Sequence, residues 1–170
     1  MYLILDIGMT GQGKSDFVKG LIKSKPNDRY FIFDVNNEYQ EFSTDLEEHQ
    51  CRMTELNCTA FIDECKERRN CTCVIEDSTG FLRGNLGAKV IQVLQAKRHN
   101  NNTYILLFHS IRSVPVQLFD FANFVVLHHT NDNEKEVAKK YPVLLETFQK
   151  IRRLPLSKWP KITRVIKRLI

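Results

Sequence analysis

The chain has 170 residues, of which 42% are hydrophobic and 26% are charged, and its formal net charge is +5. This is enough for one globular domain with a sizeable core, and the longest apolar run, residues 104–108, is too short to span a bilayer. The five cysteines include no C-x-x-C pair, which argues against a disulfide framework or a zinc ribbon and favours free thiols in a cytoplasmic protein. The alternative is a metal site formed by Cys51, Cys58 and Cys65 with His49.

The first predicted strand, residues 2–7, runs into a segment with the spacing G-x-x-x-x-G-K-[ST], and a helix is predicted over residues 15–23. The segment is Gly8, Met9, Thr10, Gly11, Gln12, Gly13, Lys14 and Ser15. A strand, a loop and a helix in this order are the context of the Walker A phosphate-binding loop. Its backbone N–H groups would bind the phosphates of ATP, Lys14 would reach the β- and γ-phosphates, and Ser15 would ligate Mg²⁺. The alternative, a plain turn that binds nothing, needs neither Lys14 nor Ser15.

Apolar strands and helical segments alternate along the rest of the chain, whereas residues 43–57 carry no clear pattern. Further strands are predicted at residues 30–33, 72–75, 103–108 and 123–128, and further helices at 59–69, 88–98, 114–121, 133–141 and 143–151. This order predicts an α/β fold, a three-layer P-loop NTPase with a five-stranded, mostly parallel sheet and helices on both faces. The ligand should bind at the carboxyl ends of the strands.

The strand at residues 72–75 ends in two acids, Glu76 and Asp77. An apolar strand followed by two carboxylates is typical of a Walker B element, in which one acid holds Mg²⁺ and the next polarises the attacking water. We therefore expect Glu76 to serve the metal and Asp77 to serve the water, although the two roles could be exchanged. The structural alternative is that the acids cap the following turn.

Three further residues are candidates for the hydrolytic site. His109 ends the strand at residues 103–108, which should lie between the first and third strands, where a polar group would contact the γ-phosphate or the attacking water. Its alternative is an ordinary strand-end histidine. Arg98 and Arg112 flank the same strand, and either could stabilise the developing charge, from its own or from a neighbouring subunit. For each arginine the alternative is a solvated surface charge.

Together these motifs resemble the FtsK–HerA superfamily of P-loop ATPases, and within it small viral genome-packaging ATPases and related phage or plasmid proteins. The resemblance rests on Gly8–Ser15, on Asp34-Val35-Asn36-Asn37-Glu38-Tyr39 after the second strand, on Val74–Asp77, on Lys97-Arg98-His99, and on a polar strand end at His109. The family usually has Asp-Glu and Gln where this chain has Glu76-Asp77 and His109. The resemblance implies a homo-oligomer, commonly a hexameric ring, with ATP and Mg²⁺ between subunits and DNA in the pore.

The basic character of the chain is concentrated at its C-terminal end. Residues 151–170 hold seven basic groups and no acid, which leaves 18 basic against 20 acidic residues in the remainder. We predict a P-loop ATPase domain over residues 1–150 and a basic tail over 151–170, with a short amphipathic helix at residues 160–170. The tail could pack on its own domain, bind DNA or a neighbouring subunit, or lie on a membrane surface or viral capsid.

Three functions remain open on the sequence. The first is an ATP-hydrolysing motor that translocates DNA for viral genome packaging, located in the cytoplasm, or in the host cytoplasm if the protein is viral. The second is a P-loop phosphotransferase acting on a small molecule, which would need an arginine-rich lid; residues 110–122 contain one arginine. The third is a nucleotide-dependent assembly factor with weak hydrolysis, which the order Glu76-Asp77 makes credible.

Overall fold

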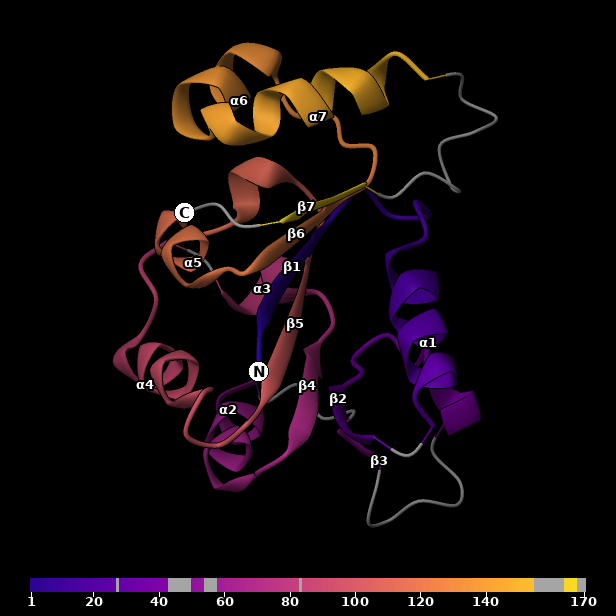
Figure 1. The fold of residues 1–170 in the computed structure, drawn as a ribbon, viewed down its shortest axis with the longest axis vertical. Helices are drawn as coiled ribbons and strands as arrows, with labels where there is room; N and C mark the ends of the chain where they lie inside the picture. The colour runs from indigo at the N-terminus through magenta and orange to yellow at the C-terminus, as the bar shows by residue number, and fades with distance from the viewer. Residues whose placement is uncertain (27, 43–49, 54–57, 83, 155–163, 168–170) are drawn as a thin grey trace.

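The computed structural model describes residues 1–26, 28–42, 50–53, 58–82, 84–154 and 164–167. Within these ranges seven strands form one sheet in the order β3-β2-β4-β5-β1-β6-β7 (Figure 1). The strands are β1 (Leu3–Ile7), β2 (Arg29–Phe33), β3 (Gln50–Met53), β4 (Cys71–Ile75), β5 (Thr103–Phe108), β6 (Phe124–Leu127) and β7 (Arg164–Lys167). All neighbours pair in parallel except β6 and β7, which are antiparallel. The predicted fold class is confirmed.

The five predicted strands are present as β1, β2, β4, β5 and β6, and β5 lies between β1 and β4 as expected. The two additional strands are at the edges of the sheet. β3 lies in the stretch without a clear sequence pattern, and β7 lies where an amphipathic helix was predicted. The helix prediction is wrong for Arg164–Lys167, because their backbone pairs with β6. The other residues of that predicted helix lie outside the described part of the chain.

Helices cover both faces of the sheet. Figure 1 shows α1 alone on one side and α2, α4 and α5 on the other. The helices are α1 (Lys14–Ser24), α2 (Cys58–Glu67), α3 (Ser78–Phe81), α4 (Ala88–Ala96), α5 (Val116–Phe121), α6 (Glu134–Lys140) and α7 (Pro142–Arg152), with 3₁₀ turns η1 (Gln40–Phe42) and η2 (Ile111–Ser113). None of the helices in the described ranges is long and apolar enough to cross a membrane.

The strands β1, β2, β4, β5 and β6 are largely buried on both faces, which explains why they are almost continuously apolar. On the α1 side, Val18 and Ile22 pack with Ile32 and other strand residues in one buried cluster. On the opposite side, a larger cluster includes the stacked rings of Phe31 and Phe61, whose centroids are 4.3 Å apart. Alternate residues of β2 therefore belong to different clusters, as the pleat of a strand requires.

Four cysteines have described side chains, and all four are free thiols. Cys65, Cys71 and Cys73 are buried and Cys58 is half-buried. Among the described residues, no group of three or more His, Cys, Asp and Glu side chains could hold a metal ion. His49 and the side chain of Cys51, which the alternative metal site also needs, lie outside the description.

The amino ends of the strands are held by asparagine amides. Asn102 is fully buried; its Oδ1 accepts a hydrogen bond from the Cys71 N–H (3.1 Å) and its Nδ2 donates to the Arg68 carbonyl (2.9 Å). In the same way Asn123 Oδ1 accepts from the Leu3 N–H at 2.9 Å. Because an amide can both donate and accept, it satisfies backbone groups that the sheet leaves unpaired at this edge.

Candidate active site

The phosphate loop connects β1 to α1 and has the backbone geometry that its glycines permit. Gly11 and Gly13 have φ angles of 76° and 84°, in the left-handed region that side chains disfavour. Gly8 is needed for space, since a Cβ at this position would lie 2.6 Å from the Cβ of His128. The Walker A spacing therefore folds into a loop that opens at the carboxyl edge of the sheet, directly before a helix N-terminus.

A buried polar pair lies beneath the start of this loop. Asp6, in β1, and His128, which follows β6, are essentially inaccessible to solvent, and Oδ1 of Asp6 lies 2.7 Å from Nε2 of His128. Burial raises the pKa of Asp6, and the histidine opposes this effect. The pair joins β1 to β6 next to the position where Gly8 contacts His128.

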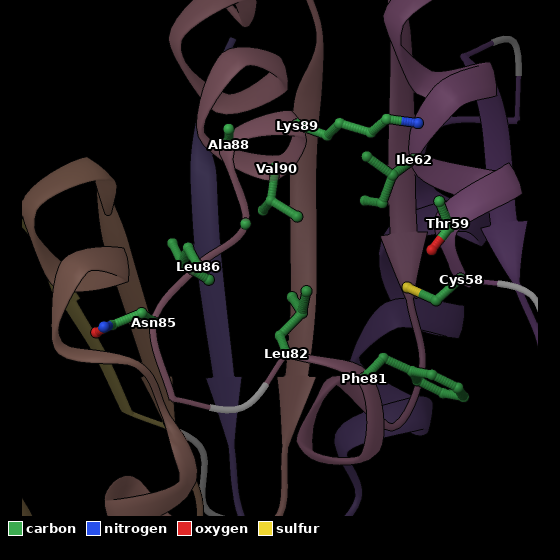
Figure 2. Close-up of a pocket in the computed structure, with 11 residues that line it drawn as sticks. Cys58, Thr59, Ile62, Phe81, Leu82, Asn85, Leu86, Ala88, Lys89 and Val90 are labelled. Atoms are coloured by element: carbon green, nitrogen blue, oxygen red, sulfur yellow. The ribbon is translucent and has the colours of Figure 1, made fainter.

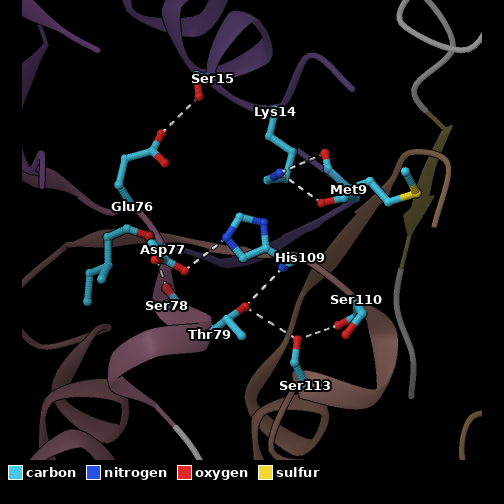
Figure 3. Close-up of polar contacts among 12 residues, drawn as sticks. Met9, Lys14, Ser15, Glu76, Asp77, Ser78, Thr79, His109, Ser110 and Ser113 are labelled. Atoms are coloured by element: carbon cyan, nitrogen blue, oxygen red, sulfur yellow. Dashed lines mark hydrogen bonds and ion pairs between the residues drawn. The ribbon is translucent and has the colours of Figure 1, made fainter. Parts of the chain in front are cut away.

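Lys14 lies folded over the loop. Its Nζ donates to the carbonyls of Gly8 (2.8 Å) and Met9 (3.0 Å), and the residue is only 7% exposed. Figure 3 shows the Lys14 side chain beside Met9. Burial lowers the pKa of Lys14, while the charges of Asp6 and Glu76 oppose the shift. The ammonium group thus lies at the loop with hydrogen bonds that a phosphate group can replace.

Ser15 and Glu76 come together from α1 and from the end of β4. The Ser15 hydroxyl donates to Glu76 Oε1 at 3.2 Å, and the Tyr39 hydroxyl donates to the same oxygen. Glu76 is 3% exposed, and burial raises its pKa to about 7, although the hydrogen bond from Tyr39 opposes this. A hydroxyl and a carboxylate are hard oxygen ligands of the kind that Mg²⁺ takes, so these two residues fit the predicted metal site.

Asp77 and His109 are in direct contact. His109 Nε2 lies 3.0 Å from Asp77 Oδ1. Figure 3 shows the two side chains pointing toward each other. Thr79 Oγ1 accepts a hydrogen bond from the His109 backbone N–H at 3.0 Å and so ties the end of β5 to α3. The second acid of the Walker B pair and the strand-end histidine therefore form one unit across β4 and β5.

These groups line a single cleft of about 520 Å³. Its lining residues are Thr10, Gly11, Gly13, Lys14, Ser15, Asp16, Asn36, Glu38, Glu76, Asp77 and His109. The structure thus brings together the phosphate loop, both Walker B acids and the strand-end histidine, all at the carboxyl edge of the sheet. A parallel sheet places its ligand at this edge.

The two arginines are placed differently. Arg98 lies in the turn between α4 and β5, at the amino edge of the sheet, and is exposed. Since the cleft is at the opposite edge, a role for Arg98 in the cleft of its own chain is wrong. Arg112 lies in η2, at the same edge as the cleft; it is exposed, and its backbone N–H donates to Asp132 Oδ1 at 3.2 Å. Neither arginine lines the cleft.

Sequence reasoning did not assign a role to Asp34 and Tyr39, although both lie in the segment Asp34–Tyr39 that carries part of the family resemblance. The aspartate is fully buried and holds the turn after β2, and the tyrosine reaches Glu76. Their spacing was the only signal in the sequence. It does not predict the contact between Tyr39 and Glu76, because this contact depends on how the turn folds.

A second hollow, of about 330 Å³, lies between α2 and the segment that joins α3 to α4 (Figure 2). Its lining is mainly apolar, with Ile62, Leu82 and Val90 facing one another. At its rim Lys89 Nζ lies 2.9 Å from Asp63 Oδ2. It holds no convergent set of ionisable groups, so the cleft at the phosphate loop is the site where chemistry is expected.

Comparisons with solved structures agree with this description. B204, the DNA-packaging ATPase from Sulfolobus turreted icosahedral virus, is 14% identical with a TM-score of 0.74, over 99% of this chain and 98% of that chain. The genome packaging NTPase B204 from Sulfolobus turreted icosahedral virus 2, in complex with ATP-gammaS, is 16% identical with a TM-score of 0.73, over 99% and 98%. The N-terminal domain of zonular occludens toxin from Neisseria meningitidis is 12% identical with a TM-score of 0.53, over 81% and 89%. At these identities the likeness shows a common fold.

A family model identifies the family of the chain, although no curated protein sequence matches it. The model of the family described as "Helicase HerA, central domain" matches residues 6–167, which is most of the chain and includes the phosphate loop, both Walker B acids and His109. The chain therefore belongs to the family of the helicase HerA central domain, and is an ATPase domain of the HerA–FtsK type.

Proposed function

We propose that this protein hydrolyses ATP with Mg²⁺ and uses the energy to translocate DNA during viral genome packaging. The observation that carries the proposal is the convergence of Lys14, the Ser15–Glu76 pair and the Asp77–His109 pair in one cleft. Family membership supports ATP hydrolysis, and the similarity to the packaging ATPase B204 supports the DNA substrate.

Each group in the cleft has a role that follows from its position. Lys14 would exchange the carbonyls of Gly8 and Met9 for phosphate oxygens. Ser15 and Glu76 would hold Mg²⁺, which when bound neutralises charge on the phosphates. Asp77 would accept a proton from the attacking water, while His109 holds the Asp77 carboxylate at the γ-phosphate end of the cleft.

The cleft as described lacks an arginine, and we therefore propose that the active form is a homo-oligomer. Arg98 and Arg112 are both exposed and do not line the cleft of their own chain. Supplied by a neighbouring subunit, either could stabilise the developing charge on the phosphates, an effect worth roughly 10³–10⁵ in rate. A ring of such subunits would also surround DNA.

A nucleotide-dependent assembly factor with weak hydrolysis is the second candidate. It is favoured by the contact between Asp77 and His109, because this contact engages the carboxylate that would accept a proton from water. If this candidate is right, the protein binds ATP tightly but releases phosphate slowly with or without DNA.

One experiment separates the two candidates. ATP hydrolysis is measured with and without double-stranded DNA over a range of salt concentrations, and the mass of the assembly is measured by light scattering. The motor predicts a DNA-stimulated oligomer whose stimulation falls as salt rises, because phosphate contacts release counterions. A monomer that binds ATP and is indifferent to DNA at every salt concentration would contradict the motor.

A further inference from the structure

The turn that follows β2 connects this strand to the cleft. Tyr39, at the end of the turn, donates a hydrogen bond to the carboxylate of Glu76. Asp34, the first residue after β2, is fully buried. Its Oδ1 accepts from the Glu38 N–H at 2.8 Å, and its Oδ2 accepts from the Tyr39 N–H at 3.1 Å. Both oxygens of one carboxylate thus hold consecutive backbone N–H groups, which fixes the position at which Tyr39 leaves the turn.

The Tyr39 side chain is fixed as firmly as its backbone. It is fully buried, and it belongs to the same cluster as Val18 and Ile22 of α1. Lys19 Nζ lies 5.8 Å from the centre of the ring. The Tyr39 hydroxyl donates a hydrogen bond to Glu76 Oε1.

We propose that Tyr39 is a positioning residue for the metal site, which holds the Glu76 carboxylate toward Ser15 through the turn that Asp34 organises. The inference rests on the proposed function, because it concerns the Mg²⁺ of the same cleft. Ser15 and Tyr39 both donate to Oε1 of Glu76. When the Ser15 hydroxyl turns its oxygen toward a metal, Tyr39 is the donor that still fixes the carboxylate. Partners of metal ligands commonly act in this way.

The test is the substitution Tyr39→Phe, which removes the hydroxyl and keeps the buried ring. The matched control is Tyr30→Phe. Tyr30 is in the same buried cluster, at the other end of β2, and its hydroxyl donates to the Leu21 and Lys25 carbonyls, away from the cleft. Mn²⁺ is titrated into each protein with a non-hydrolysable ATP analogue bound, and free Mn²⁺ is measured by electron paramagnetic resonance. Affinity for the analogue alone is measured without metal.

Tyr39→Phe is expected to weaken Mn²⁺ binding about 10–100-fold, while affinity for the metal-free analogue stays unchanged. Tyr30→Phe should change neither. Asp34→Asn, which removes one acceptor for the backbone N–H groups, should weaken Mn²⁺ in the same direction. Wild-type Mn²⁺ affinity in Tyr39→Phe would overturn the inference, and so would an equal loss in Tyr30→Phe, which would indicate a general packing defect.

The wild-type titration separates this inference from the proposed function. If the wild-type protein binds Mn²⁺ with the nucleotide and Tyr39→Phe binds it equally well, the positioning role is wrong and the function stands. If the wild-type protein binds no metal with the nucleotide, the proposed function fails, and the positioning role fails with it.

Discussion

The two edges of the parallel sheet both contain buried polar groups, but the side chains that provide them differ. At the amino edge, neutral amides such as Asn102 and Asn123 pair with backbone groups that the strands leave open. At the carboxyl edge, ionisable groups of the cleft are buried, and burial shifts the pKa values of Lys14 and Glu76 toward the neutral forms. The amides stabilise the fold. Burial of the ionisable groups costs desolvation free energy, which a bound ligand of opposite charge can offset.

The largest effect is expected for Lys14→Ala, which removes the ammonium group from the phosphate loop. ATP hydrolysis should fall by about 10³-fold and nucleotide binding should be lost in a fluorescence titration. Lys97→Ala is the matched control at the amino edge: Lys97 is 8% exposed, and its Nζ donates to the Phe121 carbonyl at 3.2 Å. This variant should lose stability and keep nucleotide binding. An equal loss of nucleotide binding in Lys14→Ala and Lys97→Ala would contradict the view that only the carboxyl edge binds the ligand.

Asp77→Asn keeps the shape of the side chain and removes its basicity. We expect turnover to fall by about 10²-fold, while nucleotide affinity stays at the wild-type value, because the phosphate loop and Ser15 are untouched. Phosphate release under single-turnover conditions, beside equilibrium binding, makes the distinction. Full hydrolysis in this variant would show that the base is another group, and Glu76 would be the next residue to test.

Asn102→Ala should produce the opposite pattern to Asp77→Asn. Its loss leaves the Cys71 N–H and the Arg68 carbonyl without their partner in a buried position. At about 1–3 kcal/mol for each unsatisfied group, the free energy of unfolding should fall by about 3–4 kcal/mol in urea denaturation. Nucleotide affinity of the folded fraction should be unchanged. A loss of nucleotide affinity in the folded protein would mean that the two edges are coupled.

A smaller effect is expected from pH. The pKa of Glu76 is raised from 4.5 to about 7, so the folded protein holds a proton that the unfolded chain releases. The contribution of Glu76 to stability is therefore complete below pH 4.5, falls as the pH rises through this window, and is lost above about pH 7. The loss amounts to about 3 kcal/mol. Urea denaturation of the nucleotide-free protein from pH 4.5 to 8 measures it.

The variant Glu76→Gln isolates this effect, since glutamine keeps the size and cannot ionise. The wild-type protein should lose stability relative to Glu76→Gln as the pH rises from 4.5 to 7. Parallel stability curves for the two proteins over this range would show that the Glu76 carboxylate does not carry the pH dependence.

The comparison of the two edges also shows what sequence alone could predict. The phosphate loop has a spacing that belongs to one local structure, and the buried strands are apolar on both faces, so the loop and five strands follow from the pattern. The edge strands do not. β3 has the polar sequence Gln-Cys-Arg-Met, and β7 lies where the alternation of charged and apolar residues also suits a helix. Each pairs on one side only, where burial imposes a weaker pattern.

Contacts made through the tertiary fold were also beyond the sequence. Asn102 is recognisable as part of a helix-breaking run, but not as the partner of Cys71 and Arg68. Tyr39 follows Asp34 at a spacing that suggested a family motif, yet its contact with Glu76 requires the turn to fold back against β4. Arg98 precedes β5 and therefore lies at the amino end of that strand, away from the cleft.

The buried pair of Asp6 and His128 has a consequence for how the sheet assembles. β6 aligns with β1 so that Asp6 is opposite Val126, and only this alignment brings His128 within 2.7 Å of Asp6. A slip of β6 by one residue would turn His128 to the opposite face of the sheet. The carboxylate of Asp6 would then be buried without its partner, at a cost of several kcal/mol. The pair therefore disfavours other alignments of these two apolar strands. The same alignment places His128 against Gly8, where the phosphate loop begins.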